Sequence, residues 1–145
     1  MAEQAEARSR LMKAREKSGK SPKELSVYVQ NSISAYYDLE NCDGDLYMTI
    51  SLRSLSDLCS ALGIKAKYLF LESERSASAI SLNQLSSEIR NHLNETGLTI
   101  SEFEHRIGFT IASSLVEPNE ALNWNVDCLR LVCKEIGLNW RFVLP

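Results

Sequence analysis

The sequence predicts an all-α fold made of two tandem bundles, each with four to five short helices. Apolar residues make up 44% of the 145 positions, which is enough for a packed core. They recur at the three- and four-residue spacings of amphipathic helices, and helix-capping patterns stand ahead of several apolar runs. Two stretches of the chain also match each other position by position. Internal repetition of this kind is a strong guide to fold.

The repeat consists of residues of matching type at two constant offsets. At an offset of 78, Leu11, Gly19, Ser21, Glu24, Leu25, Val29 and Ser32 match Ile89, Gly97, Thr99, Glu102, Phe103, Ile107 and Thr110. At an offset of 74, Leu55, Leu58, Cys59, Leu62, Gly63 and Ile64 match Leu129, Val132, Cys133, Ile136, Gly137 and Leu138. We therefore predict unit one over residues 1–71, a linker of small and charged residues over 72–79, and unit two over residues 80–145.

Unit one begins with two capped helices. Residues 5–18 are rich in Ala, Glu, Arg, Lys and Leu, which favours a helix, and Gly19 suits its C-terminal cap. Ser21 and Glu24 form a capping-box pattern with Pro22 at the first helical position, so a second helix is expected there. The second helix is expected to end near residues 30–31, and Ser32 caps a third helix over residues 33–41. A turn follows over 42–45, and Thr49 or Ser51 caps a fourth helix that ends at Gly63. The apolar segment over 67–71 fits a short helix or an extended segment.

Unit two shows the same pattern of capping residues at helix starts and glycines at helix ends. Its first helix is expected to start with the capping-box pattern of Ser81 and Gln84 and to end at Gly97. A second helix is capped by Thr99 and Glu102, and a third by Thr110, before a break at Pro118. A fourth helix is capped by Asn125 and ends at Gly137.

Several residues of unit one fit the pattern of one known family. Leu25, Val29, Ser32, Tyr36, Leu39 and Glu40 hold the pattern positions, and Ala61-Leu62-Gly63-Ile64 follows at its end. Residues 21–64 thus resemble the phage-repressor-like (Xre/Cro) helix-turn-helix family. Gln30 and Asn31 stand where that family usually has glycine and an apolar residue. Unit two keeps the turn as Ile107-Gly108-Phe109-Thr110, but Pro118 lies where the family's glutamate would be. The resemblance implies two tandem lambda-repressor-like helix-turn-helix bundles.

The resemblance also implies that the helix over residues 33–41 enters the major groove of DNA. Its expected outward residues are Ser34, Ala35, Tyr37, Asp38 and Asn41. Lys20, Lys23 and Ser32 are expected to approach phosphates, because lysines and helix N-termini bind anions. This helix contains no Arg, Lys or Gln, and residues 99–122 carry one Arg against four Glu. Any DNA contacts are therefore expected in unit one.

These observations lead to two hypotheses for function. The first is a DNA-binding transcriptional regulator that binds double-stranded DNA through unit one, while unit two mediates interaction or dimerisation. The second is a protein-interaction module, such as an antitoxin, immunity or adaptor protein, on a helix-turn-helix scaffold that no longer binds DNA. Residues 1–23 carry seven Lys and Arg against three Glu, although the whole chain has a net charge of −3. The apolar C-terminal segment, residues 140–144, fits packing on its own core or contact with a partner or a second copy.

No enzymatic chemistry is predicted from the chain. The two histidines, His92 and His105, form no catalytic pattern with a nucleophile, and no glycine-rich phosphate loop is present. Cys59 and Cys133 occupy equivalent apolar positions, so we expect buried thiols and no metal or cofactor. The absence of an export signal and of a long apolar run leads us to expect a cytoplasmic protein with no membrane partner.

Overall fold

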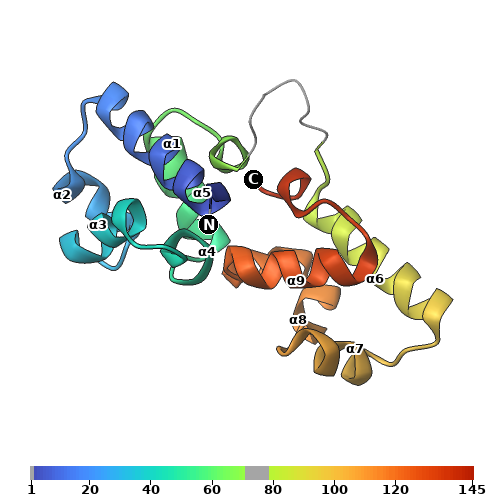
Figure 1. The fold of residues 1–145 in the computed structure, drawn as a ribbon. Helices are drawn as coiled ribbons and strands as arrows, with labels where there is room; N and C mark the ends of the chain where they lie inside the picture. Colours follow the sequence, from blue (N-terminus) through green and yellow to red (C-terminus); the bar gives the residue numbers. More distant parts are fainter. Residues whose placement is uncertain (1, 71–78) are drawn as a thin grey trace.

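The computed structural model describes residues 2–70 and 79–145, and most of these residues are helical, as the sequence predicts (Figure 1). An isolated antiparallel bridge between Ser51 and Asn125 is the single β pairing within the described residues. None of the helices in residues 2–70 and 79–145 combines the length and apolar character needed to cross a bilayer. Apart from Ala79, the predicted linker lies outside the described residues.

The N-terminal half, residues 2–70, contains most of the predicted elements. They are α1 (Ala2–Ser18), α2 (Pro22–Leu25), the 3-10 helix η1 (Ser26–Tyr28), α3 (Ile33–Asn41), α4 (Asp45–Met48), α5 (Leu52–Ala61) and the 3-10 helix η2 (Ala66–Leu69). The capping box of Ser21 and Glu24 and the cap at Ser32 are confirmed. Of the two alternatives for the cap of α5, Thr49 and Ser51, the structure has Ser51. Of the apolar segment predicted over residues 67–71, residues 67–69 belong to η2 and Phe70 is its C-cap, so the short-helix alternative holds there; residue 71 lies outside the described residues.

The second helix is shorter than predicted. Instead of running to residue 30, the α-helix ends at Leu25 and continues as one 3-10 turn. The Ser26 hydroxyl donates to the Lys23 carbonyl at 2.6 Å, and side-chain bonds of this kind compete with regular helix geometry. Gln30 and Asn31 then adopt φ values of 57° and 56°, the left-handed region in which the family pattern would place glycine. The sequence did not predict α4, whose first residue, Asp45, is the last residue of the turn predicted over 42–45.

The C-terminal half, residues 79–145, follows the predicted order more closely. Its elements are α6 (Leu82–Thr96), α7 (Ile100–Ile107), α8 (Ala112–Val116), the 3-10 helix η4 (Pro118–Asn123), α9 (Val126–Ile136) and the 3-10 helix η5 (Trp140–Phe142). The capping boxes that begin at Ser81 and Thr99 and the cap at Asn125 are confirmed. Gly97 and Gly137 end their helices in the left-handed conformation, as predicted.

The predicted cap at Thr110 is wrong. α8 begins at Ala112, and no side chain of its own N-cap residue accepts a hydrogen bond. The Glu104 carboxylate accepts instead, from the backbone N–H groups of Ile111 at 2.5 Å and Ala112 at 3.2 Å. A carboxylate reaching over from α7 thus stabilises the positive end of α8. Pro118 does not simply break the chain, because it begins η4.

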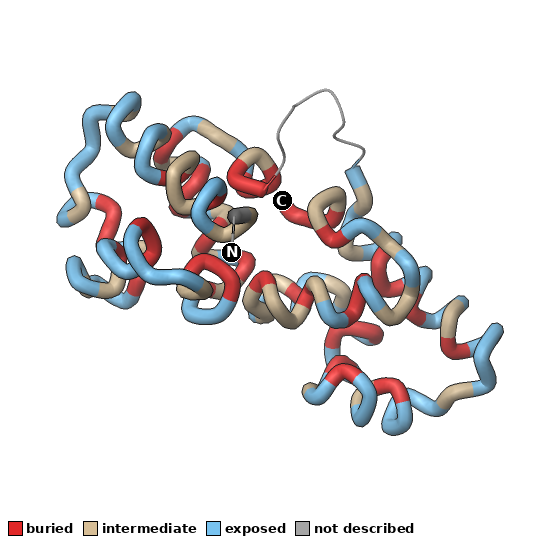
Figure 2. Tube along the Cα trace, viewed as in Figure 1, coloured by how far each residue is buried: buried red, intermediate tan, exposed pale blue. Residues whose placement is uncertain are grey.

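The buried apolar residues of both halves form one continuous cluster (Figure 2). Cys59 and Cys133 are free, fully buried thiols within it, as expected. Burial raises the pKa of each of these thiols to about 12. The cluster means that neither half buries its apolar surface independently of the other.

Side chains near the C-terminus connect the two halves. Trp140 packs edge-on against Tyr47 and Phe70, with ring centroids 6.3 and 5.2 Å apart. Arg141 donates from Nε to the Phe70 carbonyl at 3.0 Å and ion-pairs with Glu3. Trp140 is 9% exposed, and Val143 and Leu144 are each 4% exposed. The apolar C-terminal segment therefore packs inside its own chain, which is the first of the two interpretations of it, and does not present these side chains to a partner.

Candidate nucleic-acid interface

The residues predicted to contact DNA all reach the surface around α2 and α3. Six of them are exposed: Lys20, Lys23, Ser34, Tyr37, Asp38 and Asn41. Ser32 and Ala35 are half-buried, because the Ser32 hydroxyl caps α3 by accepting from the Ala35 N–H at 3.1 Å. α3 presents this face outward because Tyr36 and Leu39, on its opposite side, are fully buried.

A buried ion pair holds α3 against α1. The Arg15 guanidinium donates to both carboxylate oxygens of Glu40, at 2.7 and 3.0 Å. Glu40 is only 7% exposed, and its carboxylate raises the pKa of Arg15 above the ordinary value. Bidentate pairs of this kind fix orientation as well as contributing energy. The glutamate that fits the family pattern therefore has a structural partner, Arg15, which nothing in the local sequence indicated.

Two further arginines of α1 are also directed inward. Arg8 pairs with Asp43 at 2.6 Å and donates to the Glu40 carbonyl at 3.4 Å. Arg10 donates to the Leu69 carbonyl at 2.9 Å. Because their donors are used within the N-terminal half, the positive charge of residues 1–23 is smaller at the surface than the sequence suggests.

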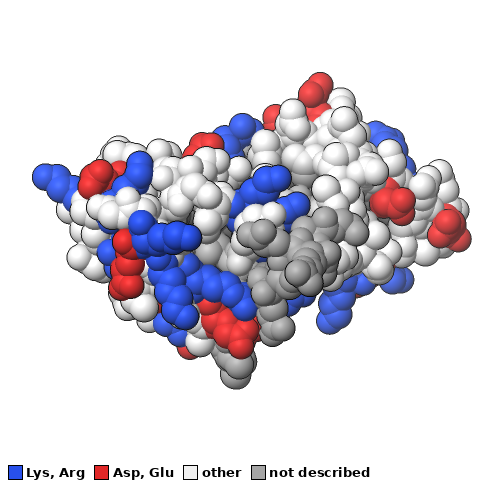
Figure 3. Space-filling view, turned by 90° about the horizontal axis from the view of Figure 1, so that it is seen from above, with Lys and Arg blue, Asp and Glu red and all other residues white. Residues whose placement is uncertain are grey.

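Exposed lysines and Arg53 supply the accessible positive charge of this half. Lys13, Lys17, Lys20 and Lys23 are exposed, and the ion pairs among the described residues involve none of them. Figure 3, which views the molecule from the α1 side, shows Lys and Arg gathered over the N-terminal half with acidic side chains between them. The surface is thus basic in places and is not a continuous basic patch.

The outward face of α3 is apolar and acidic. Ile33 and Tyr37, one helical turn apart, are 42% and 47% exposed. The Asn41 side-chain amide donates to the Tyr37 carbonyl at 2.8 Å, so it bonds to its own helix and does not point freely outward. Ser34 lies 3.2 Å from the Ser32 hydroxyl. Ser34 and the Tyr37 hydroxyl are therefore the side chains of this face best placed to donate to an external group.

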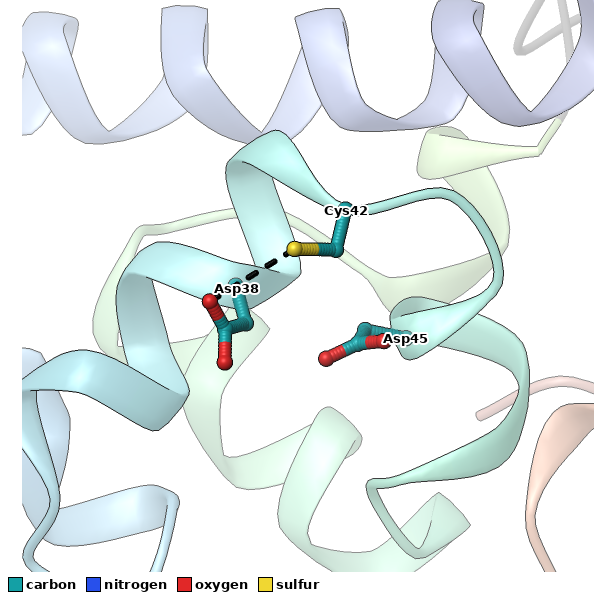
Figure 4. Close-up of side chains that lie close together, drawn as sticks. All are labelled: Asp38, Cys42 and Asp45. Carbon is teal, nitrogen blue, oxygen red and sulfur yellow. Dashed lines mark hydrogen bonds between the residues drawn. The ribbon is translucent and has the colours of Figure 1, made fainter.

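Asp38 belongs to a small surface cluster with Cys42 and Asp45 (Figure 4). Their ligand-type atoms lie within 4.8 Å of one another, and the Cys42 thiol donates to Asp38 at 3.5 Å. Desolvation and then the hydrogen bond to Asp38 raise the pKa of Cys42, and desolvation and Asp38 raise the pKa of Asp45. The cluster therefore favours a protonated thiol at Cys42.

In the C-terminal half, the polar groups of the region equivalent to α3 bond within the protein. The Ser114 hydroxyl is buried and donates to the Ile111 carbonyl at 2.7 Å, and Leu115 is only 5% exposed. Arg90 donates to the Leu115 carbonyl at 2.6 Å. Glu104, one of the acids counted against DNA binding there, caps α8. This region therefore offers few free donors to a nucleic acid.

Comparisons of the chain with protein-family models, with curated proteins and with solved structures found no match. The resemblance to the Xre/Cro family thus depends on the residues named above.

Proposed function

We propose that the protein is a DNA-binding regulator whose N-terminal half contacts the duplex. The observation that supports this most directly is a set of exposed lysines beside the rigidly held helix α3, which join no ion pair within the part of the chain that the structure describes. Lys20 and Lys23 would neutralise phosphates on either side of the Ser21 cap. The first turns of α3 would then face the major groove.

The side chains of α3 suggest modest sequence discrimination. Ser34 can donate to or accept from a base edge, Ala35 can contact a thymine methyl, and the Tyr37 hydroxyl can reach a phosphate. Asp38, near the other end of the helix, repels phosphates. The groove would therefore be entered by the N-terminal part of α3, with its acidic end directed away from the backbone.

The number of accessible lysines sets the expected salt dependence. Neutralising four phosphates with Lys13, Lys17, Lys20 and Lys23 would give a slope of log K against log salt of about −3.6. If only Lys20 and Lys23 make contact, the slope would be about −1.8. Binding by one chain is therefore expected to be weak at physiological salt and readily measurable at low salt.

The first prediction is a salt-dependent anisotropy change on a fluorescent duplex. Lys23→Ala should weaken binding to every duplex sequence and reduce the salt slope by about one unit, because one phosphate contact is lost. Lys134→Ala is a matched control, since Lys134 is an exposed lysine on α9 in the other half. Equal effects of the two substitutions, or no binding at low salt, would rule out the proposed interface.

A protein partner is the second candidate function, and the exposure of Ile33 and Tyr37 favours it. An apolar pair on a helix without cations, bordered by Asp38, suits a partner that has an apolar pocket with a basic rim. An antitoxin, immunity or adaptor protein would use such a face. Affinity capture with the intact chain and with an Ile33→Ser, Tyr37→Ser variant separates the two functions. A partner retained only by the intact chain, together with no DNA binding, would support this second function.

A further inference from the structure

The contacts between the two halves join elements that are equivalent in the sequence repeat. At the offset of 74, α4 corresponds to residues 119–122 within η4, and α5 corresponds to residues 126–135 within α9. By the same offset, η2 corresponds to residues 140–143, which include η5. Each inter-half contact can therefore be compared with its equivalent in the other direction.

The main helix contacts are reciprocal. α4 packs against α9, and the equivalent of α4, η4, packs against the equivalent of α9, α5. Figure 1 shows α4 and α9 meeting near the middle of the molecule. A contact in which i touches j and the equivalent of i touches the equivalent of j is the signature of a twofold, self-complementary interface.

The centre of this interface is the antiparallel bridge between Ser51 and Asn125. These residues are themselves equivalent at the offset of 74, and each is the N-cap of its helix, α5 or α9. The Leu52 N–H donates to the Trp124 carbonyl at 2.7 Å. An antiparallel pair maps onto itself under a twofold rotation, so a twofold axis relating the halves would pass through this bridge.

Aromatic side chains beside η2 and in η5 also pack together across the two halves. Phe70 follows η2 and packs against Trp140 at the start of η5, with ring centroids 5.2 Å apart. The Arg130 guanidinium of α9 lies over the Tyr47 ring of α4 at 5.1 Å. The interface thus contains buried aromatic side chains of the kind that stabilise dimers.

We infer that the two halves form an internal pseudo-dimer, in which the C-terminal half takes the place that a second copy of the chain would take against α4, α5 and η2. The surface that would join two copies is then occupied within one chain. The chain therefore needs no second copy to cover this surface, and we expect it to be a monomer. This inference does not depend on DNA binding.

One asymmetry at the axis provides a test. The Asn125 side chain caps α9 by accepting from the Cys128 N–H at 2.8 Å, and its amide also donates across the interface to the Met48 carbonyl at 3.0 Å. Ser51 caps α5 through the Ser54 N–H at 3.1 Å, but has no amide for the equivalent carbonyl, that of Leu122. Serine and asparagine cap helices about equally well, so exchanging them changes the cross-interface bond and leaves the caps intact.

The second prediction follows from this exchange. Asn125→Ser should lower the midpoint of thermal unfolding by about 2–4 °C, because one hydrogen bond is lost. Combining it with Ser51→Asn should restore the midpoint to within about 1 °C of the original, because the new amide donates in the equivalent position. A double variant no more stable than Asn125→Ser would overturn the twofold relationship.

The mass in solution supplies an independent check. The intact chain should elute and sediment as a particle of 16.3 kDa over a wide range of micromolar concentrations. A particle of twice that mass at low micromolar concentration would contradict the inference that the chain needs no second copy. Both measurements are made without DNA, so a failure of the proposed function leaves their outcomes unchanged.

Discussion

Arg15 and Glu40 show how a single pair determines the placement of the surface helix α3. The two residues are 25 positions apart, and Glu40 is buried, so its charge depends on the guanidinium that meets both of its oxygens. Local spacing identifies Glu40 as a position of the family pattern. It does not identify the arginine, because Arg8, Arg10 and Arg15 all lie on the same helix and only Arg15 reaches the Glu40 carboxylate.

We predict that Arg15→Ala destabilises the fold by about 3 kcal/mol, because it leaves the buried Glu40 carboxylate without its partner. Combining Arg15→Met with Glu40→Leu should recover most of that loss, since an apolar pair removes the buried charge. Urea unfolding followed by circular dichroism measures both variants. A double variant as unstable as Arg15→Ala would mean that α3 depends on these side chains in some other way.

The helices divide into those with caps in the local sequence and those positioned by distant groups. The starts of α2, α3, α5, α6, α7 and α9 were predicted, because a side-chain oxygen three residues ahead of the bonded N–H is a local pattern. α8 has no such pattern and begins where Glu104 reaches from α7. At the end of α2, the Ser26 hydroxyl donates to the Lys23 carbonyl. The presence of a serine at this position did not by itself indicate that the helix would end there.

Two substitutions test the capping of α8. Glu104→Ala should destabilise the protein by about 1–2 kcal/mol, because the carboxylate accepts from two otherwise unsatisfied N–H groups. Thr110→Ala, at the predicted cap, should change stability by less than about 0.5 kcal/mol. Chemical denaturation of the two variants gives the comparison, and a larger loss for Thr110→Ala would reverse the assignment.

In the whole molecule, Trp140 joins the two halves through Tyr47 and Phe70, while Arg130 and Arg141 lie over its ring at 5.6 and 4.6 Å. The buried cluster to which it belongs extends through both halves. Unfolding one half would therefore expose apolar surface of the other. We expect the halves to unfold together despite the repeat in the sequence.

Trp140→Ala should therefore lower the free energy of unfolding by about 3–5 kcal/mol, as expected for truncating a buried aromatic side chain. In the unmodified chain, the transitions followed by tryptophan fluorescence and by circular dichroism should coincide, because one core unfolds in one step. Two separated transitions would show that the halves are stable independently. Val116→Ala serves as a control, since Val116 is 76% exposed.

The sequence by itself determined the all-α class, most helix starts, the glycine ends and the burial of Cys59 and Cys133, because these depend on spacing and capping within a few residues. It also placed Ser34, Tyr37, Asp38 and Asn41 on the outer face of α3, since they lie between the apolar residues that this helix buries. Tertiary structure alone decided where the arginines of α1 point, what covers Trp140 and how Ser51 meets Asn125. These contacts join groups far apart in the chain, and packing of apolar surfaces selects them among several partners of the same type.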